Sequence, residues 1–217
     1  MEKRLEQAVL DLYAIDYSDH KLAKCIEGRG ISTHFGWEPK WPLHYITFPG
    51  LAFSMKWLSG DFLEIGAHEG EFTVLLTELA KEEELPKRHV YVVDPWDGRQ
   101  QGNEEVFNKF IEYMEPYSNF GFMRAGSESQ EAKDWIASMN LCFAWVDGLH
   151  TYEAVKADIA TAKTGFKGPG IIGLDDVRGP FHFNGPIMQA VRESEDDQWK
   201  HIESPHPFTH TFLVREV

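Results

Sequence analysis

The sequence predicts an α/β fold with a mostly parallel sheet, and three patterns support this prediction. Short apolar runs alternate with helical patterns from residue 61 onward. Continuously apolar strands that alternate with helices are typical of a parallel sheet buried on both faces. The chain then closes with two strand-like runs on either side of Pro205-His206-Pro207, which predicts an antiparallel hairpin. Together, these runs predict a seven-stranded sheet with helices on both faces.

The predicted elements follow one another without an internal repeat or a domain boundary. Strands are expected at 61–65, 89–94, 120–124, 141–146, 171–174, 199–204 and 209–214, and helices at 71–81, 103–115, 129–139 and 151–164. We therefore expect a single domain over 1–217, with a core at 58–217. The preceding segment, 1–57, is expected to hold an amphipathic helix and, at 28–50, an aromatic stretch. That stretch is either an ordered loop packed on the core or a lid over a pocket.

Composition excludes several classes of partner. The 217 residues carry a formal net charge of −14, which argues against nucleic acid and against an anionic membrane surface. The only two cysteines, Cys25 and Cys142, fit a reducing compartment. The sequence shows neither a long apolar stretch nor a signal-peptide pattern, so it predicts a cytoplasmic protein.

The stretch at 64–70 reads Glu-Ile-Gly-Ala-His-Glu-Gly and joins an apolar run to a helical pattern. Glycines at such a turn let a ligand approach the backbone and the helix N-terminus. An ordinary strand-to-helix turn with two glycines would have the same pattern. The spacing Glu-x-Gly-x-x-x-Gly also resembles motif I of the class I S-adenosylmethionine (SAM) methyltransferases, which share a Rossmann-like fold. The resemblance implies that SAM is bound at Glu64, Gly66, Ala67, His68 and Gly70.

In open parallel sheets, ligands bind beyond the carboxyl ends of the strands. Asp94 ends the second strand, where one carboxylate can accept hydrogen bonds from both ribose hydroxyls; an ordinary loop aspartate is the alternative. Trp96 either covers the adenine ring or belongs to the core. Ser127 resembles the adenine-contacting position of the family, although Ser127 or Ser129 could equally be the N-cap of the next helix.

Three carboxylates follow two neighbouring strands at Asp147, Asp175 and Asp176. Neighbouring strands lie about 5 Å apart, and unpaired like charges at that distance raise one another's pKa values. A hard divalent cation would resolve the repulsion, with Mg²⁺ expected first and Ca²⁺ or Mn²⁺ next. Otherwise, these acids cap helices or face solvent.

The same residues, together with His150, resemble the metal-dependent O-methyltransferases of the catechol, caffeoyl-CoA and macrolide-sugar types. The resemblance covers about residues 58–178. It implies that Asp147, Asp175 and Asp176 hold Mg²⁺, that Asp147 borders SAM, and that His150 is the general base. The catechol type has Asn where this chain has Asp176, which is a departure from that pattern.

The predicted function is therefore SAM-dependent, Mg²⁺-dependent methylation of a small-molecule hydroxyl on a vicinal diol, sugar or catechol. The segments 34–48 and 178–186 are expected to wall the acceptor pocket. Three alternatives remain: a metal-independent methyltransferase, a non-catalytic SAM-binding module, and a hydroxylase-like chemistry on the same scaffold. The sequence leaves open whether the chain forms a homo-oligomer.

Overall fold

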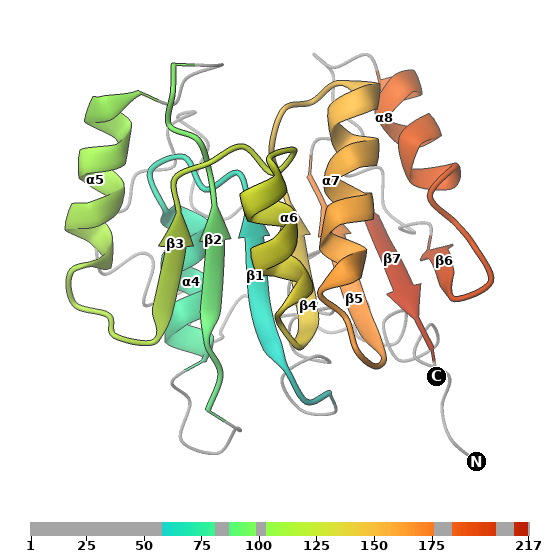
Figure 1. The fold of residues 1–217 in the computed structure, drawn as a ribbon, viewed down its shortest axis with the longest axis horizontal. Coiled ribbons are helices and arrows are strands. Elements are labelled where there is room, and N and C mark those ends of the chain that lie inside the picture. Colours follow the sequence, from blue (N-terminus) through green and yellow to red (C-terminus); the bar gives the residue numbers. More distant parts are fainter. Residues whose placement is uncertain (1–57, 81–86, 99–102, 176–183, 203–210, 217) are drawn as a thin grey trace, which may run out of the picture.

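The computed structural model describes residues 58–80, 87–98, 103–175, 184–202 and 211–216 (Figure 1). Its strands are β1 (Asp61–Ile65), β2 (Val90–Val93), β3 (Phe120–Met123), β4 (Leu141–Val146), β5 (Gly170–Leu174), β6 (Trp199–Ile202) and β7 (Thr211–Arg215). Its helices are α4 (Glu71–Leu79), α5 (Glu104–Met114), α6 (Gln130–Ala137), α7 (Tyr152–Thr164) and α8 (Asn184–Arg192).

The seven strands form one sheet in the order β3-β2-β1-β4-β5-β7-β6. Strands β1 to β5 are parallel, whereas β7 runs antiparallel to both β5 and β6. This arrangement confirms the predicted fold class. Because β1 pairs with β2 on one side and β4 on the other, the strand order reverses at β1. Ligands of open α/β sheets bind at such a reversal, beyond the carboxyl ends of the strands.

The register brings those carboxyl ends to one edge. Ile65 of β1 pairs with Val93 of β2 and with Val146 of β4, and Val146 pairs with Leu174 of β5. The residues that follow these strands therefore share one edge of the sheet, as the sequence predicts.

Helices cover both faces of the sheet, with α4 behind it and α6, α7 and α8 in front (Figure 1). Alternate strand residues point to opposite faces. Phe62 therefore joins the core cluster under α4 and α5, whereas its neighbour Leu63 joins the cluster under α6, α7 and α8. Both side chains are fully buried. Burial on both faces explains why these strands have continuous apolar runs.

Most predicted elements are present with ends shifted by a few residues. Asn103 caps α5 as expected, because its side chain accepts a hydrogen bond from the Val106 amide at 3.1 Å. Helix α8 was not predicted, since Gly185 and Pro186 indicate a loop. Proline is tolerated there because the amide it replaces has no partner in the first turn of a helix. Ile187 and Val191 then bury the inner face of α8.

Several expectations lie outside the described residues. They are the helix and the aromatic segment within 1–57, the turn at 205–207, Asp176, and residues 178–183 of the segment expected to wall the acceptor pocket. The remaining residues of that segment, 184–186, begin α8. Among the described helices, none has the length and hydropathy needed to span a bilayer.

Candidate functional site

The glycine turn after β1 packs directly on the turn after β4. Gly66 has φ +87°, and a Cβ on it would lie 2.1 Å from the backbone oxygen of Asp147. A residue with a side chain would therefore push these two turns apart. Gly70 has φ +90° and precedes α4, where a Cβ would meet the Phe110 ring at 2.7 Å. The two glycines therefore keep this turn tight against Asp147 and Phe110.

Asp94 holds the glycine turn in place. Its Oδ2 accepts hydrogen bonds from the backbone amides of Ala67 at 2.9 Å and His68 at 3.1 Å. Its Oδ1 accepts one from the Trp96 amide at 2.8 Å. Burial raises the pKa of Asp94, and these three hydrogen bonds oppose that shift. The predicted ribose residue is thus also a support for the turn, which the sequence pattern alone does not indicate.

Glu64 lies beneath the same turn and is almost fully buried. The Thr73 hydroxyl of α4 donates a hydrogen bond to its carboxylate. Burial raises the pKa of Glu64 well above its usual value, and the charges of Asp147 and Asp94 raise it further. Burial and these neighbouring charges therefore favour the neutral, protonated form of Glu64.

Trp96 belongs to the core. Only 1% of its surface is exposed, and its ring contacts Phe107, Phe110 and Phe122. Its indole Nε1–H donates to the backbone oxygen of His68 at 2.8 Å. Of the two roles considered for Trp96, this burial favours the core role, in which the side chain supports the turn from below.

The predicted metal ligands begin at adjacent strand ends. The Asp147 amide donates to the backbone oxygen of Ile65 at 2.8 Å, and the Asp175 amide donates to that of Val146 at 3.0 Å. These bonds continue the pairing of β1, β4 and β5, so both residues lie at the carboxyl edge. Within the part of the chain that the structure describes, no three His, Cys, Asp or Glu side chains form a metal-binding group. The third predicted ligand, Asp176, lies outside that part.

His150 contacts Asp147. Its Nε2 lies 3.1 Å from Asp147 Oδ1, and both side chains are partly exposed, at 23% and 34%. Which of the two groups donates depends on the tautomer of the imidazole.

Ser127 does not cap a helix. Ser129 caps α6 instead, accepting a hydrogen bond from the Ala132 amide at 3.1 Å. The Ser127 hydroxyl donates to the Asp158 carboxylate of α7, a residue that the sequence analysis did not consider. An available signal was the position of Asp158 within the apolar stripe of Val155, Ile159 and Ala162, where a carboxylate is unusual.

Residues 63–177 match the family described as a methyltransferase domain. The chain belongs to this family. The match covers β1 to β5 and the site at their carboxyl ends, and as a member the chain is a SAM-dependent methyltransferase. No curated protein matches it significantly.

Solved structures share the fold of this methyltransferase at low sequence identity. CalS11, described as a TDP-rhamnose 3'-O-methyltransferase of calicheamicin biosynthesis, is 14% identical with a TM-score of 0.60, over 99% of this chain and 96% of CalS11. The SAH-bound methyltransferase PaMTH1 of Podospora anserina is 12% identical with a TM-score of 0.60, over 97% of this chain and 88% of that one. An rRNA methylase of Streptococcus thermophilus is 14% identical with a TM-score of 0.55, over 82% and 98%. At such identities, the likeness shows the fold and not the acceptor.

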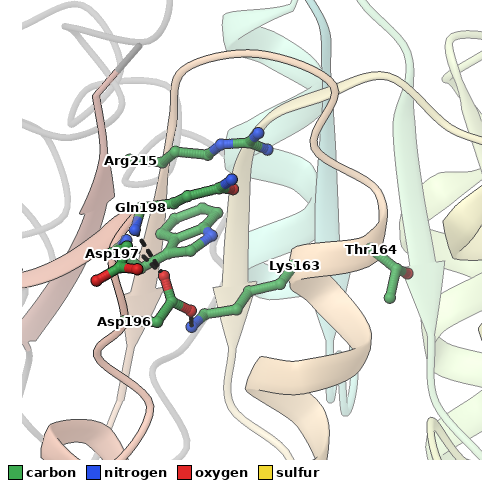
Figure 2. Close-up of a pocket in the computed structure, with 7 residues that line it drawn as sticks. Lys163, Thr164, Asp196, Asp197, Gln198 and Arg215 are labelled. Atoms are coloured by element: carbon green, nitrogen blue, oxygen red, sulfur yellow. Dashed lines mark hydrogen bonds and ion pairs between the residues drawn. The ribbon is translucent and has the colours of Figure 1, made fainter.

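A hollow of about 430 Å³ lies at the opposite edge of the methyltransferase sheet. It is lined by Lys163, Thr164, Asp196, Asp197, Gln198, Trp199 and Arg215 (Figure 2). Lys163 Nζ binds Asp196 Oδ2 at 2.7 Å, and Asp196 Oδ1 accepts the Gln198 and Trp199 amides. These groups satisfy one another's hydrogen-bonding capacity, and the bonds to the Gln198 and Trp199 amides fix the start of β6. We therefore assign this hollow a structural role.

Proposed function

We propose that this methyltransferase transfers the methyl group of SAM to a hydroxyl of a small molecule, with His150 as general base. The observation that carries the proposal is the contact between His150 and Asp147 at the edge where the glycine turn also lies. A base and a site for a cationic cofactor then face the same space. The net charge of −14 also suits the positive charge of the SAM sulfonium.

In this proposal, Glu64, Gly66, Ala67, His68 and Gly70 surround the amino-acid end of SAM, and Asp94 binds its ribose. Gly66 and Gly70 let the cofactor approach the backbone and the first turn of α4. Ser127 faces the adenine. Because Asp94 already accepts three backbone hydrogen bonds, we expect the ribose to use the remaining acceptor capacity of its carboxylate.

His150 is the general base in this proposal. Asp147 orients the imidazole through their contact, and the imidazole takes the proton of the acceptor hydroxyl. As that proton leaves, the oxygen forms a bond to the methyl carbon of SAM while the carbon–sulfur bond breaks, giving S-adenosylhomocysteine (SAH). Positioning of the two reactants supplies much of the rate in such a transfer.

Carboxylate oxygens are the ligands that a hard divalent cation prefers, and Asp147 and Asp175 follow neighbouring strands at this edge. Asp147, Asp175 and Asp176 would hold Mg²⁺. Bound there, Mg²⁺ would lower the pKa of an acceptor hydroxyl. The contact between Asp147 and His150 equally favours a second candidate, a metal-independent O-methyltransferase in which Asp147 only orients the base.

Two considerations favour a small acceptor over RNA. The net charge of −14 opposes binding of a phosphate backbone. The structural neighbour CalS11 acts on a sugar nucleotide, and its match covers 99% of this chain. We therefore propose a sugar, vicinal diol or catechol as the acceptor class.

The first experiment is calorimetric titration with SAH, followed by methyl transfer from labelled SAM to sugar nucleotides, diols and catechols. Each assay is run after chelation and again with added Mg²⁺. We expect SAH to bind and Mg²⁺ to stimulate transfer. Asp147→Asn and Asp175→Asn should abolish the stimulation, whereas Asp197→Asn, an exposed acid at the opposite edge, should retain it. Full transfer after chelation would establish the metal-independent candidate, and absence of SAH binding would contradict the cofactor site.

His150→Gln tests the base. Loss of a general base lowers kcat by about 10²–10⁴-fold, whereas the SAH dissociation constant should remain nearly unchanged. One measurement is kcat with the accepted substrate. The other is the SAH dissociation constant, from calorimetric titration of the same preparation. Unchanged turnover in His150→Gln would remove His150 from the mechanism.

A further inference from the structure

Asp158 is a buried carboxylate that the proposed mechanism does not use. It lies on α7 with 4% of its surface exposed, on the apolar face that packs on the sheet. Its Oδ1 accepts the hydrogen bond from Ser127, which follows β3. Its Oδ2 lies against Gly148, which follows β4, so that a Cβ on Gly148 would come within 2.8 Å of it. Asp158 thus contacts two of the turns at the carboxyl edge.

The ionisation state of Asp158 fixes the direction of the Ser127 hydrogen bond. Burial raises the pKa of Asp158 to about 6. The Ser127 hydrogen bond and the positive charge of protonated His150 lower the pKa, whereas the negative charge of Glu128 raises it. The hydrogen bond runs from the Ser127 hydroxyl to Asp158 Oδ1, and an ionised carboxylate has no hydrogen to give. Ser127 must be the donor.

A hydroxyl has one hydrogen and two lone pairs. Because the hydrogen of Ser127 points inward to Asp158, its oxygen can offer only lone pairs to a ligand. The neighbouring Glu128 carboxylate folds over Gly126, where a Cβ would lie 2.2 Å from its Oε2. The turn after β3 is therefore rich in hydrogen-bond acceptors, and a ligand group that faces Ser127 has to be a donor.

We propose that Asp158 is a specificity-determining positioning residue, which orients the Ser127 hydroxyl so that the site selects a 6-amino purine over a 6-oxo purine. The inference rests on the proposed function, since it takes Ser127 to face the adenine of SAM. The 6-amino group of adenine donates hydrogen bonds, whereas the 6-oxo group of hypoxanthine accepts them. An oxo group would therefore meet the lone pairs of Ser127 with no hydrogen between the two oxygens.

The experiment compares calorimetric titrations of the full chain with SAH and with S-inosylhomocysteine, its 6-oxo analogue. We expect the wild type to prefer SAH by about tenfold or more, because an unmatched polar pair is costlier than an unmade hydrogen bond. In Asp158→Asn, the side-chain amide can donate a hydrogen bond to the Ser127 oxygen. The Ser127 hydroxyl hydrogen can then turn toward the ligand. The preference should then fall to within about threefold, mainly through tighter binding of the inosyl ligand.

Three further variants make the test specific. Ser127→Ala should lose the preference to the same extent, and adding Asp158→Asn to it should change nothing more, since the two residues act as one unit. Glu153→Gln, which removes an exposed acid from the first turn of the same helix, should keep the wild-type preference.

The outcomes separate the inference from the proposed function. Absence of SAH binding to the wild type would overturn the cofactor site and the inference with it. Normal SAH binding with an undiminished preference in Asp158→Asn would overturn the inference alone. An equal loss of affinity for SAH and for S-inosylhomocysteine in Asp158→Asn would also overturn it, because it would show that Asp158 has a purely structural role. If Asp158→Asn does not fold, Ser127→Ala decides the matter, because a full preference in that variant contradicts the proposal.

Discussion

At the residue scale, Gly66 determines how closely the turns after β1 and β4 approach each other. Its φ of +87° is a conformation that residues with a Cβ rarely adopt, and its Cα lies against the Asp147 backbone. Gly98 has the same φ of +87°, but a Cβ there would meet nothing within 4 Å. Substitutions at Gly66 and Gly98 therefore distinguish the cost of backbone strain from the cost of a steric clash.

We predict that Gly66→Ala destabilises the protein much more than Gly98→Ala. The left-handed conformation costs a residue with a Cβ about 1–2 kcal/mol, and this cost applies to both variants. Only Gly66→Ala adds the clash with Asp147, so it should also lose SAH binding. Urea unfolding and SAH titration measure the two effects. Equal losses in both variants would show that the turns can separate at no cost.

The order of the residues along the sequence indicates which of them lie at this edge but not what they contact. Asp94, Asp147 and Asp175 each follow an apolar strand, so their place could be predicted from position alone. Their partners could not, because Asp94 binds amides that lie 26 and 27 positions earlier, and Ser127 binds a carboxylate 31 positions later. Such contacts depend on how helices and turns pack in three dimensions. The burial of Trp96 has the same origin.

At the element scale, α8 is the helix that local pattern did not reveal. It packs on α7 through Ile187 and Val191, which are 3% and 0% exposed. An ion pair also links α7 to the residue that follows α8, since Lys156 Nζ lies 2.6 Å from Glu193 Oε2. The Lys156 hydrogen bond is the largest cause of the lowering of the Glu193 pKa to about 2. This pair is exposed to solvent, so burial of apolar surface is the stronger reason for the position of α8.

We predict that Ile187→Ala lowers the free energy of unfolding by about 2–5 kcal/mol, the usual cost of such a cavity in a core. Glu193→Gln should have a much smaller effect, because water compensates exposed charges that lose their partner. Urea unfolding of both variants provides the comparison. A larger loss in Glu193→Gln would mean that the ion pair positions the helix.

At the scale of the whole molecule, the surplus of acidic residues is a property of the surface as well as of the site. The chain has 35 Asp and Glu against 21 Lys and Arg. Like charges in excess repel one another in the compact state. The burial of apolar side chains in the two core clusters must outweigh that repulsion for the protein to stay folded.

We predict that the melting temperature rises when NaCl is raised from about 0.01 M to about 0.15 M, since the Debye length falls from about 30 Å to about 8 Å. Calorimetry in one buffer at constant pH measures the shift, and glycerol at equal osmolality controls for non-ionic effects. A fall in the melting temperature would show that attractive surface ion pairs outweigh the net repulsion.

The position of β7 also has a consequence for synthesis of the protein. β7 lies between β5 and β6 in the sheet, although it follows both of them in the sequence. During translation, β6 leaves the ribosome before the strand that will attach it to the sheet. The edge of β5 then stays unpaired until Arg215 has emerged, and an unpaired edge can recruit strands from other chains. A nascent chain stalled before residue 211 should therefore bind chaperones more strongly than one that has released β7.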